Sequence, residues 1–400
     1  MMWTKAKIGD CCEITSSKRI FFSEYVESGI PFYRSKEIIE LSNCQEISDP
    51  LYISESKYDE IAHKFGIPQP GDMLLTSVGT IGIPYIVKEK DTFYFKDGNL
   101  TWFRNFNERL DSRYLFYWVK SAEGQGVLNN TTIGSSQKAL TIAALKDLKI
   151  LCPPIGIQNR IVEILTSYDD LIENNQKQIK LLEEAAQRLY KEWFVDLRFP
   201  GHENTKITDG IPEGWSVQSI NDIAEYINGY AFKPSDWGNL GKPIIKIKEM
   251  GSGIASDTPR NTGESIPERY NVTAGDILFS WSATLSAKIW DEEDGLLNQH
   301  LFKVIPHGGV SREFVLQSIL KTLDEFSNLT TGSTMKHIQR GKLKEVHIIV
   351  PNEQMMHIYE SISEPSREQI LKLKKRIVIL QEARDRLLPK LMSGEIEHIS

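Results

Sequence analysis

The chain has 400 residues, more than one ordinary hydrophobic core requires and enough for two or more domains. Hydrophobic residues make up 40% and charged residues 25%, which excludes a fibrous, disordered or membrane-spanning chain and is typical of a globular one. The formal net charge of −7, with no excess of basic residues in either half, argues against a protein that binds nucleic acid tightly by its overall charge.

The start of the chain and its cysteines favour a cytoplasmic protein. Residues 1–7 lack the apolar core of a signal peptide, and no apolar run is long enough to span a bilayer. The four cysteines are Cys11, Cys12, Cys44 and Cys152. They form no CxxC pair and have no histidines at metal-ligand spacing, so we expect neither a zinc site nor a disulfide framework.

Four segments of the first half recur, in the same order, in the second half. Residues 3–10 match 215–222 and residues 29–38 match 241–250 at an offset of 212; residues 70–77 match 274–281 at 204, and residues 134–150 match 332–348 at 198. Between these anchors the two halves differ. The pattern predicts two copies of one domain, each adapted to a different target, with divergence by drift as the alternative.

A long helix is predicted between the two copies. Residues 157–199 contain no glycine or proline, and apolar residues recur every three or four positions, close to a heptad pattern. The predicted seam of this helix consists of Ile164, Leu171, Asn175, Ile179, Leu182 and Leu189. Asn175 either lies buried in the seam, where it would fix the register, or faces solvent or caps a neighbour.

A second helical stretch follows the second copy. Its predicted seam consists of Ile370, Leu373, Ile377, Leu380 and Leu387. Pro365 lacks a backbone donor, so we expect a short helix over residues 354–363 and a longer one that begins at Pro365. Each stripe alone would expose apolar surface, and the two can bury each other as an antiparallel intramolecular coiled coil.

These patterns predict an α/β (α+β) fold class: two tandem domains of mixed α/β structure, separated by two long antiparallel helices. The predicted limits are 1–152 for the first domain, 153–199 for the central helix, 200–352 for the second domain and 353–400 for the C-terminal helix.

Short phrases frame these helices and the second copy. They are Pro153–Gln158 and Trp193–Gly201 at the two ends of the central helix, Ile211–Trp215 before the second copy, and Leu387–Glu395 near the chain end. Together with the paired Gly-Asp-Met-Leu and Gly-Asp-Ile-Leu strands, they resemble the specificity subunits of type I restriction–modification systems over essentially all 400 residues.

The resemblance implies that the two domains are target-recognition domains, each reading one half of a split, asymmetric site in double-stranded DNA. It implies that the helices set the gap between the halves and dock two modification (methyltransferase) subunits. S-adenosylmethionine would bind the modification subunit, ATP and Mg would bind the restriction (motor-nuclease) subunit, and this chain would need no cofactor of its own.

Motifs of intrinsic catalysis are missing from the sequence. Residues 152–155 read Cys-Pro-Pro-Ile and lack the polar first residue and the aromatic last residue of an adenine methyltransferase motif. The sequence contains no Gly-x-Gly-x-x-Gly after a strand, no Walker A loop and no His-Glu-x-x-His. We therefore expect a non-catalytic subunit; the alternatives are a self-sufficient DNA methyltransferase or endonuclease, and a protein–protein adaptor.

Candidate DNA-binding residues lie in segments that both copies share. Two loops combine glycine, hydroxyl groups and lysine, with the candidates Ser135, Ser136, Gln137, Lys138, Ser333, Thr334, Lys336 and His337. Glycine lets a backbone approach phosphate closely and lysine adds charge, although turns that cap helices explain the same residues.

Two further sets of candidates follow or occupy predicted strands. Ser77, Thr80, Ser280, Ser282 and Thr284 follow buried strands, where they either bind DNA or form ordinary hairpins. Arg34 with Lys36, and Lys246 with Lys248, alternate along a predicted strand, so both cations of each pair would share one face towards DNA or solvent. The acidic run 291–294 is predicted to be a solvated turn.

Overall fold

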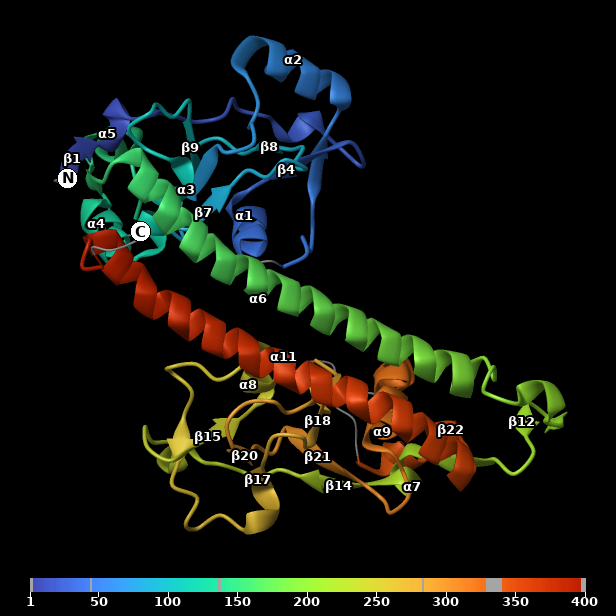
Figure 1. Cartoon of the computed structure of the whole chain (residues 1–400). Coiled ribbons are helices and arrows are strands. Elements are labelled where there is room, and N and C mark those ends of the chain that lie inside the picture. Colours follow the sequence, from blue (N-terminus) through green and yellow to red (C-terminus); the bar gives the residue numbers. More distant parts are fainter. Residues whose placement is uncertain (1–2, 44, 135–137, 283, 329–339, 397–400) are drawn as a thin grey trace. The chain divides into compact units, whose positions relative to one another are not determined.

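The computed structural model describes residues 3–43, 45–134, 138–282, 284–328 and 340–396, which form a mixture of helices and small sheets (Figure 1). The chain divides into two compact units. Unit 1 contains residues 1–174 and 377–400, and unit 2 contains residues 175–376.

Both units are closed by a pair of antiparallel strands. In unit 1, β1 (Thr4–Lys7) pairs with β10 (Lys149–Cys152), and in unit 2, β13 (Ser216–Ser219) pairs with β22 (His347–Val350). β13 begins 212 residues after β1, and β22 begins 198 residues after β10, as in the sequence matches. The predicted duplication is thus confirmed strand by strand.

Each unit contains an antiparallel four-stranded sheet, in the order β2-β9-β6-β7 in unit 1 and β14-β21-β18-β19 in unit 2. The strands are β2 (Glu13–Thr15), β6 (Met73–Thr76), β7 (Pro84–Ile86) and β9 (Leu100–Arg104), and β14 (Ala224–Asn228), β18 (Ile277–Ser280), β19 (Ser286–Ile289) and β21 (Leu301–Pro306). The central strands β6 and β18 are buried on both faces, because Met73 and Ile277 lie in one core cluster of their unit while Leu74 and Leu278 lie in another.

Short helices cover one face of this sheet. In unit 1 they are η1 (Ile8–Asp10), α3 (Ser112–Lys120), α4 (Ala122–Thr131) and α5 (Ile142–Asp147); in unit 2 they are α7 (Ile220–Ile223), α9 (Arg312–Lys321), α10 (Leu323–Asn328) and η7 (Arg340–Lys344). Asp111 caps α3 by accepting hydrogen bonds from the backbone of Arg113 and Tyr114, which explains why the helix begins there.

A second four-stranded sheet distinguishes the two copies. Its order is β3-β5-β4-β8 in unit 1 and β16-β15-β20-β17 in unit 2. The strands are β3 (Tyr25–Val26), β4 (Ile30–Tyr33), β5 (Leu51–Ile53) and β8 (Tyr94–Phe95), and β15 (Lys242–Ile245), β16 (Arg260–Asn261), β17 (Asn271–Val272) and β20 (Gly295–Leu297). The parallel pairs β4/β8 and β15/β20 are equivalent, but the added edge strand lies beside β5 in unit 1 and beside β20 in unit 2.

The connections of this sheet also differ. After β4 and β15 the chain forms α1 (Ser35–Ser42) and α8 (Ile247–Ser252), which are equivalent. The segment before β6 then folds into α2 (Glu55–Phe65), whereas the segment before β18 holds η6 (Glu268–Tyr270) and β17. A shared frame therefore carries different connections.

The central helix α6 (Ile155–Tyr190) continues into a π-helical turn, η3 (Lys191–Val195). In unit 2 this end of the helix is held by aromatic packing. The Phe194 ring centroid lies 4.9 Å from that of Phe314 in α9 and 5.0 Å from that of Tyr359. The segment that follows contains η4 (His202–Asn204), β11 (Ile207–Thr208) and β12 (Ile211–Pro212).

The second long helix, α11 (Glu353–Ser393), runs antiparallel to α6 (Figure 1). In unit 2 its first turns, with Tyr359, pack on the end of α6. In unit 1 its last turns, with Leu388 and Leu391, share a core with Ile161 near the start of α6. The beginning of one helix thus meets the end of the other within each unit, which confirms the antiparallel helix pair.

The seam needs one correction. Among the predicted positions, Ile179, Ile370 and Leu373 are buried, and Ile164, Leu182, Leu189, Ile377, Leu380 and Leu387 are partly buried. Leu171 is 40% exposed and its neighbour Ile172 is buried instead, so the prediction for Leu171 is wrong. A straight α-helix has about 3.6 residues per turn, whereas a heptad repeat has 3.5, so the buried stripe shifts around the helix. At this point Ile172, rather than Leu171, therefore faces inward.

Asn175 is a buried seam residue. Its side chain is only 2% exposed, and its amide nitrogen has no hydrogen-bond partner among the described residues. The solvent-facing alternative is therefore excluded, and the unsatisfied amide costs stability.

Pro365 does not divide the second helix. The prediction of two helices is wrong, because α11 is continuous from Glu353 to Ser393. Proline has no backbone N–H, so the Ser361 carbonyl, four residues before Pro365, receives no hydrogen bond within the helix. Both residues are exposed, so water can bind this carbonyl. Buried residues on both sides, Tyr359 and Ile370, anchor the helix across the proline.

Candidate nucleic-acid interface

In unit 1 a cluster of polar residues lies where the parallel strands β4 and β8 end. Arg34 directly follows β4 and Lys96 directly follows β8. The two strand ends are held together because the Lys96 backbone N–H donates to the Tyr33 carbonyl at 2.8 Å. The carboxyl ends of neighbouring parallel strands are a common place for binding sites in α/β sheets.

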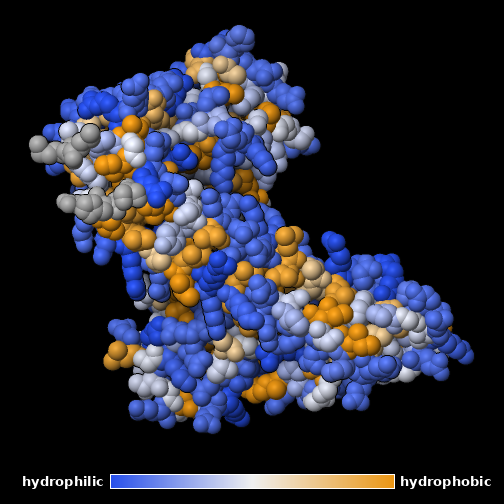
Figure 2. Space-filling model, in the orientation of Figure 1, coloured by the Kyte–Doolittle hydropathy of each residue, from blue (hydrophilic) through white to orange (hydrophobic). Residues whose placement is uncertain are grey.

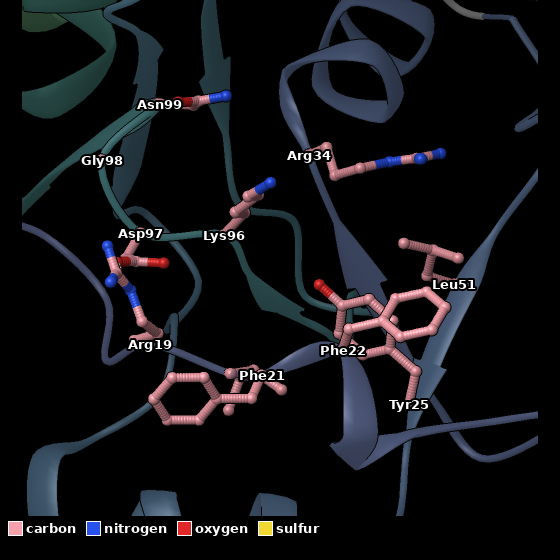
Figure 3. Close-up of a pocket in the computed structure, with 11 residues that line it drawn as sticks. Arg19, Phe21, Phe22, Tyr25, Arg34, Leu51, Lys96, Asp97, Gly98 and Asn99 are labelled. Carbon is pink, nitrogen blue, oxygen red and sulfur yellow. Dashed lines mark hydrogen bonds and ion pairs between the residues drawn. The ribbon is translucent and has the colours of Figure 1, made fainter.

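A hollow of about 650 Å³ opens at this edge of the sheet (Figure 3). Its lining combines cations and aromatic rings: Arg19, Ile20, Phe21, Phe22, Tyr25, Arg34, Leu51, Lys96, Asp97, Gly98 and Asn99. Phe21 and Phe22, from the turn η2 (Phe22–Glu24), lie across from Arg34 and Lys96 and are 61% and 87% exposed. Such exposure of two large apolar side chains has a cost in water that a binding partner would remove.

The charges in this hollow are only partly neutralised. Arg19 Nε lies 3.0 Å from the Asp97 carboxylate but remains largely exposed. Arg34 pairs with the buried Glu37, and this hydrogen bond raises the pKa of the arginine and keeps it charged. Lys96 has no side-chain partner within the described part of the chain. The hollow thus offers positive groups that phosphate oxygens can contact.

Unit 2 carries a different set of residues at the equivalent place. Lys246 follows β15 and Asn298 follows β20. The Lys246 ammonium lies 5.2 Å from the centre of the Trp237 ring, which is half exposed, and Leu240 nearby is 80% exposed. A cation and exposed apolar side chains therefore recur in the second copy, but with other residue types.

Arg34 and Lys246 lie at equivalent positions of the two copies, as the sequence matches predict, but the prediction that they lie on a strand is wrong. They do not alternate with Lys36 and Lys248 on a strand, because each strand has already ended. The Arg34 backbone N–H donates to Glu37 and that of Lys246 donates to Glu249, which starts α1 and α8. A glutamate three residues on is a signal for a helix start that the strand prediction overlooked.

Lys36 and Lys248 lie inside these helices. Lys36 Nζ is 4.0 Å from Glu40 and Lys248 Nζ is 2.7 Å from Asp257. Both lysine side chains are about half exposed, so each remains accessible to solvent.

Three of the predicted hydroxyl groups serve the fold. Ser77 is buried, with its Oγ 2.6 Å from Thr101 Oγ1. Ser280 is buried and donates to the Ser282 carbonyl at 3.2 Å, while the buried Ser282 Oγ lies 3.3 Å from His300 Nδ1. Because these three side chains are buried, they are not part of a surface that DNA can reach.

The remaining candidates are exposed or lie outside the described residues. Thr80, Lys138 and Thr284 are exposed. Seven candidates lie outside the described residues: Ser135, Ser136, Gln137, Ser333, Thr334, Lys336 and His337. The sequence analysis missed Arg19, Phe21, Phe22 and Lys96, since only the fold brings these separate segments to one hollow.

The acidic run is not a free turn. Asp291 is buried and its carboxylate lies 2.6 Å from Lys374 of α11 and 3.3 Å from Lys288. Burial opposes ionisation of Asp291, but the two lysines outweigh it and lower the pKa of the carboxyl. Glu292 accepts a hydrogen bond from the Ile254 backbone, and Glu293 pairs with Arg260. The prediction of a solvated turn is therefore wrong: the run ties the sheet to α11 within unit 2.

The chain contains two copies of one α/β domain, and these copies carry different surfaces at equivalent strand ends. Both copies pack on the same two long helices. This arrangement defines a class of protein with two different recognition domains. A family model described as the type I restriction modification DNA specificity domain matches residues 2–184 and 212–377. The chain belongs to this family.

Individual relatives agree with this assignment. The chain is 26% identical to the type I restriction enzyme MjaIX specificity subunit of Methanocaldococcus jannaschii, over 98% of this chain and 93% of the relative. It is 22% identical to the HindI specificity subunit of Haemophilus influenzae, over 64% and 71% of the two chains.

A solved structure shares the fold. The S subunit of the type I restriction–modification system from M. genitalium matches 97% of this chain and 96% of its own, with a TM-score of 0.60 and 15% identity. The described part of the chain contains no helix long and apolar enough to cross a membrane.

Proposed function

We propose that this chain is the DNA sequence-specificity subunit of a type I restriction–modification complex. Each unit carries one recognition domain, and each domain reads one half of a bipartite, asymmetric site in double-stranded DNA. The observation that carries this proposal is the pair of equivalent strand ends, which in both units combine a cation with exposed aromatic side chains but use different residues. They are Arg34 and Lys96 with Phe22 in unit 1, and Lys246 with Trp237 in unit 2.

The chain acts without a catalytic site of its own. Its partners are two modification subunits, which bind S-adenosylmethionine and methylate adenine, and restriction subunits, which use ATP and Mg. This division of work is supported by the missing methyltransferase and Walker A motifs in the sequence.

The outer faces of the long helices are the proposed docking surface for the modification subunits. In unit 2, Leu181 is 64% exposed and lines a groove of about 490 Å³ with Leu189 and Trp193. In unit 1, Val378 and Ile379 are more than half exposed. Figure 2 shows apolar surface over the stretch that α6 and α11 occupy in Figure 1. Exposed apolar side chains of this kind are typical of a subunit interface.

Domain exchange tests the proposal directly. The chain is co-expressed with a modification subunit, and methylated adenines are mapped across the genome. Replacing residues 1–152 with the corresponding domain of a relative should change one half of the methylated site and leave the other half and the gap unchanged. Exchange of residues 200–352 is the matched control, because it should change only the other half.

Three outcomes would count against the proposal. Methylation that is unchanged by both exchanges would contradict a recognition role for the domains. A complex whose affinity for DNA does not fall steeply with salt would favour a protein–protein adaptor, because phosphate contacts release counterions. Binding of S-adenosylmethionine by the isolated chain would favour a self-sufficient methyltransferase.

A further inference from the structure

One exposed apolar loop occurs at the same place in both units. We call residues 21–28 and 233–240 the apolar loops of unit 1 and unit 2. Each begins with a turn of 3-10 helix, η2 (Phe22–Glu24) or η5 (Pro234–Asp236), and the two turns are 212 residues apart. Each leads into the strand that forms the parallel pair, β4 or β15.

Both apolar loops are fixed at their two ends. At the start, the Phe21 backbone N–H donates to Glu24, and that of Lys233 donates to Asp236, each at 2.7 Å. At the end, Gly29 and Gly241 have positive φ angles and lie against a neighbouring strand, so that a Cβ would come within 2.4 Å and 2.3 Å of a backbone carbonyl oxygen. Only glycine fits there, so the backbone is fixed at the point where each loop ends.

The fixed loops expose large apolar side chains to solvent, near the start of the loop in unit 1 and towards its end in unit 2. Phe22 is 87% exposed in unit 1, and in unit 2 Leu240 is 80% and Trp237 49% exposed. Neither Phe22 nor Leu240 belongs to a buried core cluster of its unit. A rigid backbone that presents an apolar side chain to water is arranged for contact rather than for the stability of the fold.

The surroundings favour DNA as the contact. Phe22 shares a hollow with Arg19, Arg34 and Lys96, and Lys246 lies over Trp237, so each apolar loop has at least one cation close to an aromatic ring that it exposes. Such cations can bind phosphate. The residue types differ between the copies. Two identical protein partners would need the same chemistry in both units, whereas two different half-sites need different chemistry.

We propose that each apolar loop presses its most exposed apolar residue, Phe22 in unit 1 and Leu240 in unit 2, against a base step of the half-site that its unit reads. This inference rests on the proposed function and adds a mode of recognition to it. Apolar wedges unstack base steps at a cost that depends on the step, so each loop selects for deformable sequence as well as for base edges.

The test uses the full chain assembled with its modification subunits and a duplex that carries the site found by methylation mapping. We expect Phe22→Ala to weaken affinity for this duplex about tenfold to a hundredfold, as loss of one aromatic–base contact does. The slope of log affinity against log salt should stay the same, because no phosphate contact is lost. Fluorescence of 2-aminopurine placed along the half-site should rise at one step with the wild type and not with Phe22→Ala.

Matched variants separate this effect from a general loss of apolar surface. Phe22→Leu should keep most of the affinity, because leucine can also act as a wedge. Phe65→Ala removes another exposed phenylalanine of unit 1, and Val217→Ala removes an exposed apolar residue of unit 2; both should bind as the wild type does. Leu240→Ala should weaken affinity and alter discrimination only in the other half-site.

Three results would overturn the inference. Equal affinity and equal 2-aminopurine signals for wild type, Phe22→Ala and Leu240→Ala would exclude a wedge while leaving the proposed function intact. Loss of co-purifying modification subunits from a folded Phe22→Ala chain would assign the loop to protein docking. Absence of site-specific binding by the wild-type complex would overturn both the inference and the proposed function.

Discussion

A buried ion pair joins a recognition domain to its helix in unit 2. Arg367 of α11 donates to Glu313 of α9 at 2.7 Å, and the two side chains are 8% and 1% exposed. Gln317 donates to the other carboxylate oxygen, also at 2.7 Å. Desolvation of the two charges offsets much of the attraction between them. Removal of one partner is nevertheless strongly destabilising, because the other charge would then be buried without a partner.

We therefore expect Arg367→Met to destabilise unit 2 by about 3–5 kcal/mol, because it strands a buried carboxylate. The double variant Arg367→Met with Glu313→Leu should recover most of that loss, since no charge remains unpaired. Urea unfolding of both variants and the wild type measures the difference. Equal stability of the single variant and the wild type would contradict this account.

Asp291 makes the stability of unit 2 depend on pH. Burial opposes its ionisation, but Lys374 and Lys288 lower its pKa below the ordinary value. A lowered pKa stabilises the fold at pH values above the ordinary pKa, and this stabilisation is lost as pH falls through the lowered one. Asp291→Asn should reduce the free energy of unfolding at pH 7, and the gap to wild type should close in acid. Asp257→Asn, at an exposed pair, is the control and should show little effect at any pH.

Sequence patterns could not reveal these residue-level contacts. The acidic run around Asp291 reads as solvated because four adjacent charges are usually exposed, and the lysine that buries it lies 83 positions further on, at Lys374. Phe22 shows the converse: its apolar character predicts burial, yet it is 87% exposed. Burial depends on which distant segment packs against a residue, and the local pattern of residue types around it does not show that.

At the scale of elements, α11 tolerates a proline in its interior. Pro365 removes one backbone hydrogen bond, and its ring crowds the preceding turn. Replacing it with alanine should stabilise the chain by about 1–2 kcal/mol, because the helical gain exceeds the entropy that proline removes from the unfolded chain. Urea unfolding of Pro365→Ala checks this. Lys375→Ala, at an exposed position of the same helix, is the control; a Pro365→Ala chain no more stable than the control would show that the helix is already relaxed around proline.

The repeats located the frame with accuracy. The predicted offsets of 212, 204 and 198 separate β1 from β13, β6 from β18, and β10 from β22. The second sheet could not be assigned in the same way, because α2 in one copy and β17 in the other follow segments without sequence similarity. The two copies keep recognisable sequence similarity where both form the same core. They have lost it in the segments that form a different surface in each copy.

For the whole molecule, the heptad pattern predicted the helix pair that both units share. α6 passes from unit 1 into unit 2 after Asn174, and α11 passes back after Arg376, so both helices belong to both units. Neither α6 nor α11 lies within a single unit. The predicted domain limits at 152, 199 and 352 remain predictions, because the compact units divide inside the helices.

If the helix pair sets the gap between the half-sites, lengthening it should lengthen the gap. One heptad inserted into α6 after Asn174 and one into α11 after Arg376 would add about 10 Å to each helix, or about three base pairs of duplex. Methylation mapping should then find both half-sites unchanged and the gap longer by about three base pairs, because the inserts leave the recognition surfaces untouched. Inserting a heptad into α6 alone mismatches the helices and should reduce methylation without defining a new gap. A paired insertion that leaves the gap at its original length would show that something other than the helices fixes the spacing.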